Sequence, residues 1–271
     1  MNLTDINDLK NILRSNGFKP KDYLGQNFLV DEIALSEIVE AANLKPTDTV
    51  LEVGPGLGVL TEQLLAKAGN VIAVEKDPKL CGYLRRKFGK EKKLKLINDD
   101  ILRFHLKANI PGEYKVVANI PYYLTSKLFR IFLESDYPPK LMVLMVQKEV
   151  GERVTANAGE LSILGISVQI YSDPEIIAHV SKESFWPVPE VDSVILRIEP
   201  KKKYVDIKDK KLFFRIVKIA FSGKRKQIKN TIKETEALKL AKIDPMSRPQ
   251  DLTIEEWIAL YRQVEQLNLY K

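Results

Sequence analysis

The sequence has very few of the side chains that build metal centres and disulfides. Its 271 residues include one cysteine, Cys81, and two histidines, His105 and His179. A single cysteine excludes an internal disulfide and a cysteine-rich metal site. So few histidines argue against zinc, and we expect no metal. Cys81 falls in a helical pattern, where we interpret it as a buried filler.

The sequence also lacks long hydrophobic runs. No apolar stretch reaches the length that spans a membrane, and the first residues lack the basic and apolar blocks of a signal peptide. We therefore expect a cytoplasmic protein with no membrane partner, and we expect it to be a monomer. A hydrophobic content of 45% is sufficient for a packed core, and the net charge of +7 favours a polyanionic partner.

A glycine-rich turn stands out between a strand pattern and a helix pattern. The β-favouring residues 50–53 run into Gly54, Gly56 and Gly58, and leucines then recur at helical spacing. Glycine lets the backbone approach a ligand over the strand end, and a helix N-terminus suits a carboxylate or phosphate. The next strand pattern ends in Glu75, where an acid can take both hydroxyls of a ribose.

Three interpretations of this turn remain open: a site for S-adenosylmethionine (SAM), a dinucleotide site, and a purely structural turn. Dinucleotide enzymes use Gly-x-Gly-x-x-Gly, whereas the sixth position here is Val59. The spacing Gly-x-Gly-x-Gly, with Glu52 just upstream, resembles the first motif of class I methyltransferases. A SAM site is therefore favoured over that of a dehydrogenase.

Strand and helix patterns alternate along most of the chain, which predicts a parallel sheet with right-handed crossovers. Strands are expected at 49–53, 71–75, 94–97, 115–118, 141–146, 175–180 and 191–198, with helices near 58–68, 78–88, 124–134, 147–157 and 160–171. After the lysines at 201–203 only helical patterns follow. We therefore expect an α/β domain, doubly wound on a mostly parallel seven-stranded sheet, over 1–199, and a small all-helical domain over 200–271.

The fourth strand pattern runs into Asn119-Ile120-Pro121-Tyr122. An aromatic exocyclic amine is a poor nucleophile, because its lone pair is delocalised into the ring. The Asn119 side-chain oxygen and the Ile120 carbonyl could each accept one N–H of such an amine. Pro121 would fix the backbone, and Tyr122 would stack on the base. The alternative is a strand-end turn with a buried tyrosine.

With these motifs the chain resembles the ribosomal RNA adenine N6-dimethyltransferase family, which modifies two adjacent adenosines near the 3′ end of small-subunit rRNA. The resemblance rests on Leu24-Gly25-Gln26-Asn27-Phe28-Leu29, Glu52 to Gly58, Val74-Glu75, Asp99-Asp100-Ile101, Asn119 to Tyr122, Phe185 to Ser193 and Ala220 to Lys226. It implies a SAM-dependent enzyme of the class I methyltransferase fold that acts during ribosome maturation. A large-subunit rRNA methyltransferase and a non-catalytic assembly factor on the same fold are the alternatives.

The resemblance also implies roles for single residues. Phe185 would form the wall of the adenine slot opposite Tyr122, so that both belong to the catalytic set with Asn119, Ile120 and Pro121. For Asp100 a helix cap is the alternative role. The cofactor set consists of Gln26, Asn27, Leu29, Gly54, Glu75, Asp100, Ile101 and Asn119.

A cationic run near residue 225 is expected at the start of a helix. It consists of Lys224, Arg225, Lys226 and Lys229. Because the chain is basic and the implied substrate is a small ribosomal subunit, we interpret these residues as phosphate contacts. An ordinary solvated face is the alternative.

Overall fold

The computed structural model describes residues 2–21, 25–201, 207–223 and 225–270. Two compact units divide the chain: residues 1–151 with 174–200, and residues 152–173 with 201–271. The sequence places a single boundary between 199 and 200, whereas 152–173 group here with the C-terminal unit. The roles expected for the two domains, SAM binding and RNA binding, stay predictions.

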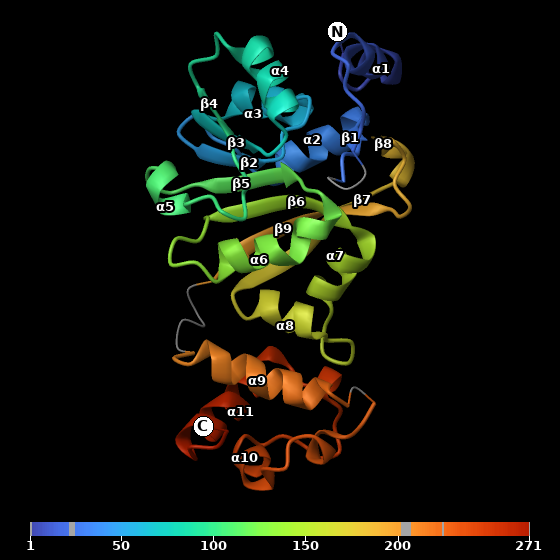
Figure 1. Ribbon diagram of the computed structural model, residues 1–271. Coiled ribbons are helices and arrows are strands. Elements are labelled where there is room, and N and C mark those ends of the chain that lie inside the picture. The colour runs from blue at the N-terminus through green and yellow to red at the C-terminus, as the bar shows by residue number, and fades with distance from the viewer. Residues whose placement is uncertain (1, 22–24, 202–206, 224, 271) are drawn as a thin grey trace. The chain divides into compact units, whose positions relative to one another are not determined.

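Figure 1 shows the secondary structure along the chain. The strands are β1 (Phe28–Leu29), β2 (Thr49–Val53), β3 (Asn70–Glu75), β4 (Leu94–Asn98), β5 (Lys115–Asn119), β6 (Leu141–Gln147), β7 (Ser172–Val180), β8 (Phe185–Trp186) and β9 (Ser193–Pro200). The α-helices are α1 (Ile6–Ser15), α2 (Glu32–Ala41), α3 (Val59–Lys67), α4 (Pro78–Phe88), α5 (Leu106–Asn109), α6 (Thr125–Leu133), α7 (Lys148–Thr155), α8 (Ile163–Gln169), α9 (Lys210–Phe221), α10 (Thr235–Leu240) and α11 (Ile254–Gln266).

Seven strands form one sheet in the order β4-β3-β2-β5-β6-β9-β7 (Figure 1). β2 pairs in parallel with β3 and β5, β3 with β4, and β5 with β6, while β9 runs antiparallel to β6. The predicted mostly parallel, doubly wound sheet is confirmed. The strand order reverses between β2 and β5, and in such sheets ligands bind beyond the carboxyl ends of the strands at this point.

Alternate residues of each strand face opposite sides of the sheet. On one side, Val50, Val71 and Val117 are fully buried under apolar side chains of α2 and α3. From β2 the chain moves to β3 toward one edge of the sheet, whereas from β5 it moves to β6 toward the other edge. Because both crossovers are right-handed, α6 between β5 and β6 covers the face of the sheet opposite to that covered by α3. The sheet is therefore covered on both faces, and its functional groups are left at the strand ends.

A second, two-stranded sheet joins segments that are far apart in sequence. β1 and β8 pair antiparallel, with Phe28 opposite Trp186 and Leu29 opposite Phe185. The backbone N–H of Val30 also donates to the carbonyl of Ser184 at 2.8 Å. The sequence predicts only irregular chain at both places, because a two-residue strand leaves no periodic pattern to detect.

In the C-terminal unit the described residues from 207 onward form only helices and loops, as expected for an all-helical part. Its core is built around the fully buried ring of Trp257, which stacks on Phe221 with ring centroids 6.0 Å apart. α11 begins with a reciprocal capping box between Thr253 and Glu256.

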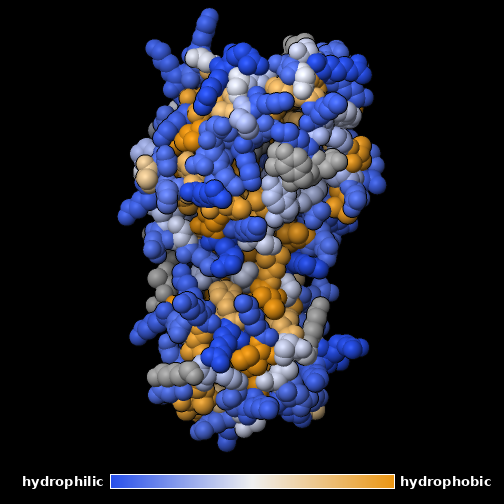
Figure 2. Space-filling model, viewed as in Figure 1, coloured by the Kyte–Doolittle hydropathy of each residue, from blue (hydrophilic) through white to orange (hydrophobic). Residues whose placement is uncertain are grey.

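On the face shown in Figure 2, hydrophilic side chains predominate. None of the helices in the described ranges is long and apolar enough to span a bilayer.

Candidate active site

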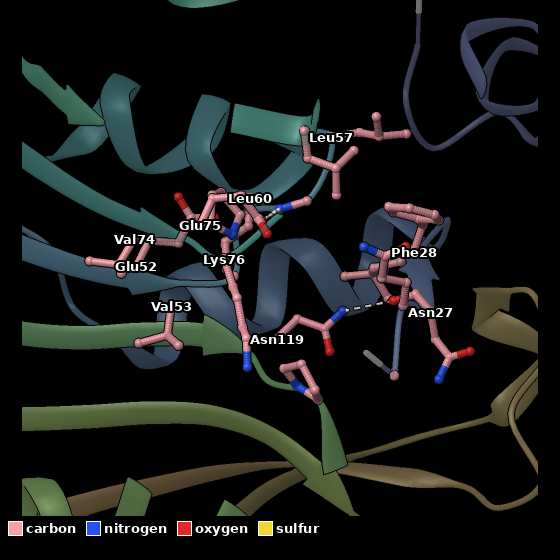
Figure 3. Close-up of a pocket in the computed structure, with 18 of the residues that line it drawn as sticks. Asn27, Phe28, Glu52, Val53, Leu57, Leu60, Val74, Glu75, Lys76 and Asn119 are labelled. Atoms are coloured by element: carbon pink, nitrogen blue, oxygen red, sulfur yellow. Dashed lines mark hydrogen bonds between the residues drawn. The ribbon is translucent and has the colours of Figure 1, made fainter. Parts of the chain in front are cut away.

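A pocket lies at the carboxyl ends of β2, β3 and β5, where the strand order reverses (Figure 3). Its empty volume, which includes space open to solvent, is about 960 Å³. Its lining comes mainly from the segments 25–29, 52–60, 74–76, 99–101 and 119–124, and the leucines Leu3, Leu9 and Leu80 complete it. All eight predicted cofactor residues therefore meet in one place.

The glycine turn forms the floor of the pocket. Gly54, Gly56 and Gly58 all have positive φ, between 60° and 84°, a region that other residues rarely adopt. At Gly58 a Cβ would lie 2.6 Å from Cε2 of Phe88, so that only glycine fits between the turn and α4. The backbone thus stays close to the pocket, and α3 begins directly behind it, at Val59.

Glu75, at the end of β3, lies in the pocket with its carboxylate held by the backbone (Figure 3). Oε1 accepts the N–H of Asp77 at 2.8 Å, and Oε2 accepts the N–H of Gly56 at 3.1 Å. Burial raises the pKa of Glu75, and the two N–H donors oppose this effect. Glu75 therefore connects the glycine turn to the end of the second parallel strand and presents a fixed acceptor to the pocket.

Glu52, two residues before the first glycine, is a pocket residue to which the sequence assigns no role. It is 1% exposed, and its Oε2 has no hydrogen-bond partner among the described residues. Burial raises the pKa of Glu52 to about 8; Thr61 beside it opposes this rise, and the nearby charge of Glu75 adds to it. This raised pKa favours the protonated carboxyl at neutral pH, because burial is costly for the charged form.

Asp100 and Ile101 line the pocket from the loop after β4. Asp100 Oδ1 accepts the N–H of Leu102 at 3.0 Å, and Oδ2 pairs with Lys76 Nζ at 2.9 Å. Asp100 thus closes a turn at 101–103 and not the helix start expected for the capping alternative, since α5 begins only at Leu106. Its position in the pocket is the one expected for a cofactor contact, a role that stays a prediction. Ile101 is 4% exposed and adds an apolar surface beside it.

Asn119 ends β5 and extends toward the N-terminal segment (Figure 3). Its Nδ2 donates to the backbone carbonyl of Asn27 at 3.4 Å. A carbonyl can only accept, so this contact fixes which side of the amide faces Asn27. No residue in the described part of the chain donates to Asn119 Oδ1. The oxygen is therefore left as an acceptor, the role that the sequence predicts for it.

The residues after Asn119 divide between the core and the pocket. Ile120 is 2% exposed, whereas Pro121 and Tyr123 line the pocket. Tyr122 is half-buried, does not line the described pocket, and shares a 2.8 Å hydrogen bond between its hydroxyl and Oγ of the buried Ser193. Burial raises the pKa of the Tyr122 hydroxyl. Its role as a stacking surface stays a prediction.

Phe185 and Leu29 are brought together by the β1–β8 pairing. Leu29 lines the pocket, whereas Phe185 is 1% exposed, belongs to the core beneath α2 and α3, and is absent from the lining. The structure thus does not place Phe185 beside Tyr122 at an open slot. Its role as the second wall of such a slot stays a prediction.

The N-terminal segment covers one side of the pocket through Gly25, Gln26, Asn27 and Phe28. Gly25 has a φ of 60°, and a Cβ there would lie 3.1 Å from that of Pro121, so the two segments pack directly together. The sequence assigns no role to Phe28, although its ring faces Gly56 of the glycine turn. It predicts no pocket contact for Tyr123 either. Phe28 lies inside the motif 24–29 and Tyr123 directly follows the motif 119–122, and these positions are the signal that could have found them.

Of the cationic run, Arg225 and Lys226 lie in the loop after α9 and Lys229 lies in a short 3₁₀ helix, so the expected helix start is wrong. α9 ends at Phe221, and the next element is a short 3₁₀ helix at Ile228–Asn230. Gly223, next to the run, cannot extend α9 without cost. Arg225, Lys226 and Lys229 are exposed, and Lys224 lies outside the described residues.

No cluster of three or more metal-ligating side chains occurs within the described ranges.

The chain is similar in sequence to a known enzyme family. The model of that family, described as ribosomal RNA adenine dimethylase, matches residues 17–266. The ribosomal RNA small subunit methyltransferase A of Dehalococcoides mccartyi is 41% identical over 262 residues, which cover 92% of this chain and 89% of that protein. The protein of the same name from Moorella thermoacetica is 38% identical over 94% of this chain and 96% of its own length.

Two solved structures have the same architecture. A dimethyladenosine transferase from Plasmodium falciparum superposes with a TM-score of 0.76 and 26% identity, over 89% of this chain and 98% of its own. The 23S rRNA methyltransferase ErmE superposes with a TM-score of 0.74 and 27% identity, over 89% of this chain and all of its own. The pocket at the β2/β5 switch point thus belongs to a methyltransferase fold.

Proposed function

The chain belongs to the ribosomal RNA adenine dimethylase family, and from this membership we infer that it is an rRNA methyltransferase that dimethylates adenines of the small subunit. The curated relatives at about 40% identity are named for the small subunit. The solved large-subunit enzyme is more distant, at 27%. We further propose that the targets are two adjacent adenosines near the 3′ end of that rRNA, which the enzyme modifies in the cytoplasm during subunit maturation.

The pocket fits SAM better than a dinucleotide. Its ionisable lining includes Glu52, Glu75, Asp99, Asp100 and Lys76, of which Glu52 is protonated and Lys76 is paired with Asp100. Glu75 and Asp99 leave the lining net acidic, which suits a cofactor with a sulfonium and an ammonium group and repels a pyrophosphate. The fixed carboxylate of Glu75 is suited to ribose hydroxyls, and the apolar surface of Ile101 is suited to an adenine ring.

SAM would supply an activated methyl group, and the residues of this chain would hold and orient the adenine that receives it. Asn119 Oδ1 would accept one N–H of the adenine N6 amine and the Ile120 carbonyl the other, which directs the nitrogen lone pair toward the methyl group. Pro121 would fix that carbonyl, and the ring of Tyr122 would stack on the base. Once a methyl group is on N6 the nitrogen carries a positive charge, so one of its protons becomes acidic and leaves to solvent, and we assign no general base.

A single observation supports this role most strongly: Asn27 takes the amide nitrogen of Asn119 and leaves its oxygen free at the end of β5. Asn119→Ala should lower methyl transfer about 100-fold or more, since an aligned acceptor acts mainly in the transition state. The assay measures radiolabelled methyl incorporation into immature small subunits. Asn70→Ala is the matched control. Asn70 begins β3, at the edge of the sheet away from the pocket, so this variant should retain full activity.

The same assay tests the alternative of a non-catalytic assembly factor. Wild-type protein that binds the subunit but incorporates no methyl would support that alternative and overturn the proposed chemistry. Near-normal turnover of Asn119→Ala would remove only the assignment of the acceptor. Mass spectrometry of the labelled rRNA would locate the dimethyladenosines.

A further inference from the structure

Asp77 lies between β3 and α4, two residues after Glu75, and its side chain is 4% exposed. A buried carboxylate is stable only when hydrogen bonds or opposite charges replace its water. Burial alone would raise the pKa of Asp77, but the Lys21 ammonium and the backbone N–H of Lys79 bring it below its ordinary value. Asp77 is therefore an ionised group inside the protein, with partners that hold it there.

The partners of Asp77 come from two sides. On its own side, Oδ1 accepts the N–H of Lys79 at 2.9 Å and caps α4, and the backbone N–H of Asp77 donates to Glu75 Oε1. From the N-terminal segment, Oδ2 accepts Lys21 Nζ at 2.6 Å and Gln26 Nε2 at 3.4 Å. The amide of Gln26 is itself oriented, because its Oε1 accepts the backbone N–H of Lys21 at 3.0 Å.

Lys21 and Gln26 thus converge on one carboxylate although five positions separate them. The residues that follow, Gly25 to Leu29, cover the pocket. Asp77 also donates to Glu75, the acceptor inside that pocket. We propose that Asp77 is a positioning residue that fastens the N-terminal segment over the cofactor pocket, so that SAM affinity depends on its ion pair with Lys21. This inference rests on the proposed function, because it takes SAM to be the ligand.

The test measures the SAM dissociation constant by titration calorimetry on the full chain. Asp77→Asn keeps a capping side chain but removes the charge, and Lys21→Gln leaves the cap of α4 intact. Each variant should bind SAM about tenfold to a hundredfold more weakly. The loss of affinity in the double variant should be clearly smaller than the sum of the two single losses, because both changes remove the ion pair between Lys21 and Asp77. Asp209→Asn is the matched control: it alters the Asp cap of α9 in the other unit and should bind like wild type.

Hydrogen exchange adds a measurement that does not depend on ligand. The amides of Gln26 and Asn27 bond within the segment, and in both variants they should exchange at least tenfold faster, while the amides of β3 stay unchanged. Affinities within twofold of wild type, or strictly additive losses in the double variant, would overturn the inference. Wild-type protein that binds no SAM would instead overturn the proposed function. Lys21→Gln keeps the test decisive if Asp77→Asn fails to fold.

Discussion

Glu52→Gln should remove the pH dependence of the free energy of unfolding that arises from the buried Glu52 carboxyl. In the folded chain the pKa of Glu52 is raised to about 8 from its ordinary value of 4.5. Between these two pH values the folded state holds a proton that the unfolded state has lost. The free energy of unfolding of the wild type must therefore fall as pH rises through this window, by about 1.4 kcal/mol per pH unit.

Glutamine has no proton to lose, so the variant lacks this contribution. The free energy of unfolding of the variant minus that of the wild type should therefore rise by about 3 kcal/mol between pH 5 and pH 8. Any pH-independent effect of the amide on stability cancels, because the prediction concerns only the change of this difference with pH. The difference is measured by urea unfolding of both proteins without ligand, monitored by circular dichroism at each pH.

Glu62→Gln is the matched control on α3, since the Glu62 side chain is 61% exposed. Its difference from wild type should stay flat across the same range. If the Glu52 difference is also flat, Glu52 is ionised in the folded protein. The reasoning from its burial would then be refuted, and a partner for Oε2 would have to exist.

Three further predictions concern the turn, the tyrosine and the cations. Gly58→Ala should lower the free energy of unfolding by about 2–4 kcal/mol, because the new Cβ meets the Phe88 ring at 2.6 Å at a φ of 84°; a loss below 1 kcal/mol in urea unfolding would contradict this. Tyr122→Phe should lower the free energy of unfolding in urea by about 1–2 kcal/mol and lower kcat, because it leaves the buried Ser193 hydroxyl unpaired. If stability and kcat are both unchanged, only the face of the Tyr122 ring matters. Replacing Arg225 and Lys226 with Gln should reduce the slope of log RNA affinity against log salt by about 0.7–0.9 per phosphate contact and leave SAM affinity unchanged. Filter binding of small subunits across a salt series measures the slope. An unchanged slope would mean that Arg225 and Lys226 belong to an ordinary solvated face.

Long periodic segments of the sequence predict most of the sheet. β2, with its run of buried apolar residues, and α4, which begins at Pro78 and ends at Phe88, are found where the patterns place them. Helix ends are less well predicted: the pattern for α8 extends over 160–171, whereas the helix spans Ile163–Gln169. Ser162 explains the later start, because its side chain caps the helix and ends the extended chain before it.

The position of residues in the candidate site was predictable where a motif has its own local chemistry, as in the glycine turn and at Asn119, while their roles stay predictions. It was less predictable where a role depends on a partner far along the chain. The sequence expects only the ring of Tyr122 to act, but Ser193, 71 positions later, bonds its hydroxyl. The raised pKa of Glu52 likewise depends on burial by several elements, which no local pattern reports.

The short pairing of β1 with β8 also bears on when the pocket can form during synthesis. Phe28 and Trp186 are 158 positions apart, so this contact closes one of the longest loops in the chain. The wall of the pocket that Phe28 and Leu29 supply is therefore completed only after residue 186 has left the ribosome and the sheet has formed. A nascent chain that ends short of this point carries the glycine turn and Glu75 but lacks the β8 partner of Phe28 and Leu29. We therefore expect cofactor binding to be a late event in the maturation of the enzyme itself.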